Sequence, residues 1–134
     1  MLDESFDRTD VAAYFQNAPE PARTGLMTLR RLILSVASET PGVGRLDEAL
    51  RWNQLAYLTP DTKSGSTLRL GVTPGGFALY AHCRTSIIPD FAAAFPGLDR
   101  IEGTRGVHFQ TAADIDPPRH AQLIRHALTY HLRR

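Results

Sequence analysis

Residues 67–83, "TLRLGVTPGGFALYAHC", contain two runs of alternating side chains on either side of a short turn. The alternation has the two-residue period of a β-strand, and "TPGG" at 73–76 is typical of a tight turn. This stretch therefore predicts an antiparallel hairpin. "LAYLT" at 55–59 and "GVHFQ" at 106–110 are also short and apolar, and they predict two further strands. In chain order, the first three strands, at 55–59, 67–72 and 77–83, should form an antiparallel meander.

Helical patterns surround these strands. We expect helices over about residues 8–17, 21–38 and 86–97, and a last helix that begins at Asp116 and runs to the C-terminus. The order is α-α-β-β-β-α-β-α, which predicts an α+β fold in which helices pack on one face of an antiparallel sheet of about four to five strands. "LDEALRW" at 46–52 is ambiguous between a helical turn and a first edge strand.

The composition predicts a single globular domain over residues 1–134. The hydrophobic content of 43% and the charged content of 22% are ordinary for such a domain. The apolar runs are too short to span a membrane, and the acidic N-terminus lacks the layout of a signal peptide. A single cysteine favours the reducing cytoplasm, and the net charge of +1 gives no general attraction to nucleic acid or to an anionic membrane.

The alternation assigns side chains to the two faces of the sheet. Phe77 and Leu79 share one face in the third strand, and the same period places Cys83 beside them in the core under the helices. A cysteine in the core is separated from its neighbour His82, so the two do not form a nucleophile and its base. The opposite, open face should carry the polar side chains Arg69, Tyr80, His82, Arg84, His108 and Gln110.

The open face is the candidate functional surface. Arginine and histidine side chains on neighbouring strands can bind an anionic group through forked hydrogen bonds, so we expect a small anionic ligand or a protein partner here. The alternative is a solvated face without a ligand, and an exposed sheet could also pair two copies as a homodimer. Trp52 is predicted either as a core residue or as part of this surface.

The leading hypothesis is a binding or adaptor domain that is not an enzyme. No catalytic residue is assigned, because the sequence has no recognisable nucleophile or metal set. A hydrolase or transferase that uses His82 or His108 as general base is a further alternative. Asp3, Glu4, Asp7 and Asp10 form a carboxylate ridge if the first helix extends back to them, and such a ridge suits a hard cation.

Four segments carry a resemblance to a known family: "LDEALRWNQLAYLT", the strands "TLRLG" and "GGFALYAHCRTS", and the ending "ADIDP…LIRHAL". The chain resembles the bacterial YdhG-like domains of unknown function, whose tryptophan segment is matched by Glu48, Leu50, Arg51, Trp52 and Tyr57. Asn53 stands where the family has glycine and Leu55 where it has proline; asparagine tolerates left-handed backbone. The resemblance implies a frataxin-like two-layer α/β sandwich. Some members are described as iron chaperones, which implies iron as the alternative ligand, held by the acidic N-terminal residues.

Overall fold

The computed structural model describes residues 5–132, and its elements alternate much as the sequence predicts. The helices are α1 (Thr9–Asn17), α2 (Ala22–Glu39), α3 (Ile87–Ala94) and α4 (Pro117–Leu128). The strands are β1 (Asp47–Arg51), β2 (Gln54–Leu58), β3 (Leu68–Thr73), β4 (Gly76–Tyr80), β5 (Arg100–Glu102) and β6 (Gly106–Phe109). Two short 3₁₀ turns, η1 (Ala112–Asp114) and η2 (Tyr130–Leu132), flank α4.

Within the described residues the strands form one six-stranded antiparallel sheet in the order β1-β2-β3-β4-β6-β5. The predicted α+β class and the meander are confirmed, and the ambiguous segment at 46–52 contains the edge strand β1. The sheet has more strands than the four to five expected. The additional strand is β5, whose three residues are too few to show a two-residue period in the sequence.

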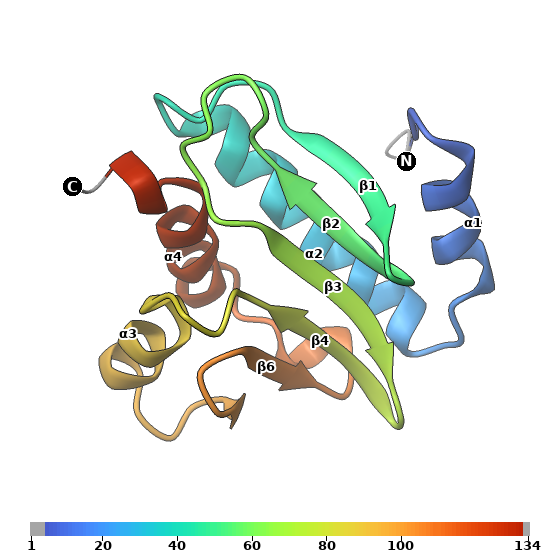
Figure 1. Ribbon diagram of the computed structural model, residues 1–134. Helices are drawn as coiled ribbons and strands as arrows, with labels where there is room; N and C mark the ends of the chain where they lie inside the picture. The colour runs from blue at the N-terminus through green and yellow to red at the C-terminus, as the bar shows by residue number, and fades with distance from the viewer. Residues whose placement is uncertain (1–4, 133–134) are drawn as a thin grey trace.

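The helices cover one face of the sheet, as predicted. Figure 1 shows α2 behind the strands and α4 at the left of the view, where it packs against α2, while α1 lies beside β1 at the edge of the sheet. Leu26, Leu29 and Ile33 recur at helical spacing on α2, and all three are fully buried. From the sheet, the ring of Phe77 fills the space that a Cβ at Gly25 would need. The core therefore lies between the apolar face of the sheet and these two helices.

The last helix and the end of β3 differ from what the sequence patterns predict. The last helix stops at Leu128 and is followed by η2, so it does not continue to the C-terminus. Val72 continues the alternation of Leu68 and Leu70, but its side chain is 39% exposed because it lies at the end of β3, beyond the last residue paired with β2. The hydroxyl of Tyr14 on α1 accepts a hydrogen bond from the Val72 backbone N–H at 3.0 Å, which satisfies this unpaired strand donor.

An ion pair between α2 and β1 lies almost out of contact with water. The Arg30 guanidinium donates to both Glu48 carboxylate oxygens, at 2.7 and 3.0 Å. The Tyr57 hydroxyl donates to the same carboxylate at 2.7 Å, and the Phe6 ring covers the guanidinium at 4.2 Å. Burial, together with the Glu48 charge, raises the pKa of Tyr57 well above its usual value. Tyr57 and Glu48 are therefore structural residues on the covered side of the sheet.

Candidate functional site

The turn between β1 and β2 holds the protein's one tryptophan out of the core. Arg51 pairs with Gln54, so the loop between the strands has two residues, Trp52 and Asn53, whose φ angles are +49° and +59°. Positive φ at both positions is what a two-residue type I′ hairpin requires. Asparagine tolerates this backbone, whereas a bulky aromatic residue is strained in it. Trp52 is also 84% exposed, so it is not a core residue and packing does not explain it.

Two guanidinium groups stack on two aromatic rings of the open face. The Arg69 guanidinium carbon lies 5.0 Å from the centre of the Trp52 ring, and that of Arg105 lies 5.0 Å from the centre of the Tyr80 ring. Arg69 on β3 is directly opposite Tyr80 on β4, which brings the two stacks next to each other. Both distances are within the range of cation–π attraction.

These residues line a pocket of about 540 Å³, which we call the open-face pocket. Its volume is within the usual range for small-molecule sites. The loop before β3 and the turn after β4 supply the rest of its wall. The lining residues are Trp52, Gln54, Gly65, Ser66, Thr67, Arg69, Tyr80, Ala81, His82, Cys83, Arg105 and His131. None of these residues, all within the described chain, carries a carboxylate.

The lining is rich in hydrogen-bond donors that the described protein does not use. Arg69 has no hydrogen bond or carboxylate partner among residues 5–132, nor do the hydroxyls of Ser66, Thr67 and Tyr80 have a partner there. The His82 Nδ1 accepts the backbone N–H of Arg84 at 3.0 Å, so the neutral ring carries its proton on Nε2. The pocket therefore offers positive charge and donors to a ligand with acceptors.

The Tyr80 hydroxyl stays protonated at neutral pH. Burial of the ring raises the pKa of Tyr80, and the nearby Glu102 charge adds to this effect, while Arg105 opposes it. Arg105 also forms an ion pair with Glu102 at 3.5 Å, on the outer side of the pocket. The phenol is thus a donor to a ligand, not a base.

The structure brings together three of the six predicted open-face residues, Arg69, Tyr80 and His82, and adds Trp52, which the sequence left open between core and surface. Arg84 is exposed in the turn after β4 and does not line the pocket. His108 lies on the open face but pairs with Glu102 at 2.6 Å and, with Gln110, lines smaller hollows near β5 instead. The open-face prediction is therefore too wide, because Arg84, His108 and Gln110 fall outside the pocket.

The prediction that Cys83 lies in the core is wrong. β4 ends at Tyr80, and Ala81 is the last buried side chain of this segment. A turn then follows, in which the Thr85 N–H bonds to the His82 carbonyl at 3.0 Å, so the strand period no longer applies. Cys83 is exposed and lines the same pocket as His82.

Sequence reasoning missed Arg105, which lies in the turn between β5 and β6. The turn residues "EGTRG" at 102–106 directly before a predicted strand were the available signal. Without β5, however, nothing in the sequence indicated that this turn folds toward Tyr80.

The acidic ridge does not form as expected in the described chain. Asp3 and Glu4 lie outside the described residues. α1 begins at Thr9, so Asp7 precedes the helix, and Asp10 accepts the N–H of Val11 at 2.8 Å in the first turn. Among residues 5–132, no group of three or more His, Cys, Asp or Glu side chains is arranged to hold a metal ion.

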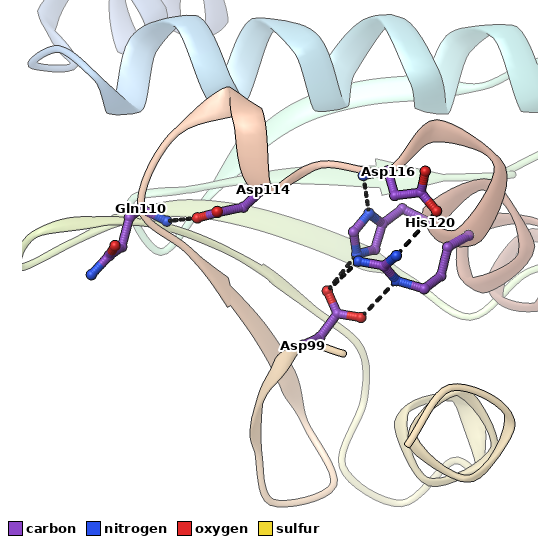
Figure 2. A network of polar contacts seen from close by, with 6 residues as sticks. Asp99, Gln110, Asp114, Asp116 and His120 are labelled. Atoms are coloured by element: carbon purple, nitrogen blue, oxygen red, sulfur yellow. Dashed lines mark hydrogen bonds and ion pairs between the residues drawn. The ribbon is translucent and has the colours of Figure 1, made fainter. Parts of the chain in front are cut away.

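A second polar cluster, drawn in Figure 2, fastens the start of α4 to the loop before β5. Asp99 accepts hydrogen bonds from Arg119 at 2.9 Å and from the His120 Nε2 at 2.8 Å. The other His120 nitrogen accepts the Asp116 N–H at 2.9 Å, so both ring nitrogens are occupied. Burial lowers the pKa of His120, which is fully buried. This histidine is therefore a structural residue and cannot transfer protons to a ligand.

Comparison of the chain with family models, with curated proteins and with solved structures gave no match. Among the helices within residues 5–132, none has the length and apolar character needed to cross a membrane.

Proposed function

We propose that this chain is a small, non-enzymatic binding domain that holds a planar anionic molecule in the open-face pocket. The observation that carries the proposal is the pair Trp52 and Arg69. The backbone at Trp52 is strained, its ring is 84% exposed, and its contact is the guanidinium of Arg69. Strain of this kind is concentrated at functional positions in proteins. An aromatic ring beside an unpaired guanidinium suits a flat molecule that carries a negative charge.

The arrangement favours binding over catalysis. No carboxylate lines the described pocket, so none orients His82 as a general base. The His82 Nδ1 is already occupied by the Arg84 N–H of its own turn. The sequence predicts an anion-binding surface over the whole open face. We assign this role only to the residues that line the pocket.

Replacement of Arg69 tests this proposal. We expect the chain to bind 2-naphthoate more tightly than the uncharged 2-naphthamide, as measured by isothermal titration calorimetry. The Arg69→Gln variant should lose about tenfold or more in 2-naphthoate affinity, because a hydrogen bond to a charged group contributes about 1.5–3 kcal/mol. Its affinity for 2-naphthamide should change little.

Arg84→Gln is the matched control, because Arg84 is exposed on the neighbouring turn but does not line the pocket. It should bind 2-naphthoate like the unchanged protein. Equal affinity for the acid and the amide, or equal losses in the two arginine variants, would refute an anion site at Arg69.

A further inference from the structure

We infer that the ligand of the open-face pocket is a phosphate ester of a heteroaromatic ring: a free nucleotide, or a nucleotide unit at the end of a single strand. The inference rests on the proposed function and narrows its ligand class. Three features of the pocket carry it: the number of its unpaired donors, the nature of its two stacks, and an amide side chain that lines the pocket together with Trp52.

The donors favour a phosphate over a carboxylate. The unpaired donors are Arg69, the His82 Nε2–H and the hydroxyls of Ser66 and Thr67 from the loop before β3. Arg105 adds a second guanidinium, whose Nε pairs with Glu102 at 3.5 Å. These groups come from three segments: the loop before β3 together with β3, the turn after β4, and the turn between β5 and β6. A carboxylate has two acceptor oxygens, whereas a terminal phosphate has three and carries more charge. A phosphate can therefore accept hydrogen bonds from more of the unpaired donors than a carboxylate can.

The two stacks favour a heteroaromatic base. Nucleic-acid bases stack on aromatic side chains and on the planes of arginine guanidinium groups, and open antiparallel sheets are a common platform for such stacking. Trp52 and Tyr80 each present a ring that is already paired with a guanidinium, on the open face of this sheet.

Gln54 supplies a polar group for the edge of a base. Its side chain lies over Gly71, with the amide nitrogen 3.5 Å from the point that a Cβ on Gly71 would occupy. The residue lines the open-face pocket together with Trp52. An amide presents a donor and an acceptor side by side, which is the pattern that pairs with base edges.

The size and charge of the site favour one nucleotide over a long strand. The pocket volume of about 540 Å³ is that of a small-molecule site. The net charge of +1 gives the chain little of the general electrostatic attraction on which binding of long nucleic acids depends.

Calorimetric titration of the full chain with five probes tests the inference: AMP, adenosine, inorganic phosphate, 2-naphthoate and a (dA)5 oligonucleotide. We expect AMP to bind at least tenfold more tightly than adenosine or phosphate, and more tightly than 2-naphthoate. If (dA)5 binds more tightly than AMP with a steep salt dependence, the strand is the source of the nucleotide; equal or weaker binding identifies the free nucleotide.

The Trp52→Asn variant separates binding from folding. Asparagine suits the left-handed backbone at this position, so the free energy of unfolding should be unchanged or higher. AMP affinity should fall about fivefold or more, since stacking of one base contributes about 1–3 kcal/mol. Arg84→Gln should again bind like the unchanged protein.

The failure of this inference can be told apart from failure of the proposed function. If 2-naphthoate binds at Arg69 and AMP binds no more tightly, the nucleotide inference is wrong and the planar-anion site stands. If neither binds, both are wrong. Unchanged AMP affinity in Trp52→Asn would likewise overturn the stacking role.

Discussion

Glu48→Ala is expected to lower the free energy of unfolding by about 3–5 kcal/mol, because it removes the carboxylate that neutralises a buried guanidinium. Arg30 is 6% exposed, and both of its bonds to Glu48 are short. The same change removes the acceptor of the buried Tyr57 hydroxyl. Urea unfolding followed by circular dichroism measures the loss.

Asp61→Ala provides the matched control. Asp61 forms a two-bond ion pair with Arg45 at 3.2 and 3.3 Å, but both side chains are more than half exposed. Such a pair contributes about 0–1 kcal/mol. If Glu48→Ala costs no more than Asp61→Ala, the pair between α2 and β1 does not stabilise the fold as its burial implies.

Stability is expected to fall as the pH is lowered below about 6.5, with His120 as a principal cause. Its folded-state pKa is lowered from the ordinary value of 6.5, so below pH 6.5 the unfolded chain takes up a proton that the folded chain does not. The stability contributed by neutral His120 is therefore complete above this pH. It is lost as the pH falls toward the lower, folded-state pKa, at up to about 1.4 kcal/mol per pH unit.

The geometry around His120 explains why protonation is unfavourable. The Asp116 N–H points at the ring's Nδ1, so a proton added there would face another donor. On the Nε2 side, Asp99 raises the pKa of His120 and Arg119 lowers it. Burial has the largest effect, so the pKa is lowered overall. Proton uptake thus disrupts the first turn of α4.

Urea unfolding at pH 8, 7, 6 and 5 measures this dependence, and His120→Gln isolates it. The variant should be less stable at pH 8, and its stability should fall less between pH 7 and pH 5. Parallel pH profiles for the two proteins would show that His120 does not cause the loss.

Much of the fold could be predicted because its central strands follow simple periods. Phe77 and Leu79 alternate with open-face residues, and both are buried as expected. The two-residue period no longer holds at Cys83, because β4 ends three residues earlier, at Tyr80, and the Cys83 side chain is exposed. Sequence alternation shows which residues share a face while a strand lasts, but the end of the strand depends on pairing with β6.

The candidate site was only partly predictable for the same kind of reason. Arg69 and Tyr80 lie on regular strands, so their shared face could be inferred. The position of Arg105 at the pocket and the exposure of Trp52 both depend on turns. Tertiary contacts decide where such turns lie. The tolerance of Asn53 for left-handed backbone was visible in the sequence, and it is the residue beside Trp52 that makes this turn possible.

The contrast between Arg69 and two arginines that hold the fold together supports a binding role for the pocket. Arg30 and Arg119 are bound by carboxylates and join elements of the fold. Arg69 contacts an exposed ring and has no carboxylate partner among residues 5–132. A cation that the fold does not use for its own stability is available to a ligand.

Two-dimensional ¹H–¹⁵N NMR of the labelled chain, titrated with 2-naphthoate, tests the location of the site most directly. The protein has one tryptophan, so a single indole N–H signal reports on Trp52. We predict that this signal shifts together with the backbone amides of residues 66–69, 80–83 and 105, while the amides around Asp99 and His120 stay in place. An unmoved indole signal, with shifts confined to other parts of the chain, would contradict the proposed site.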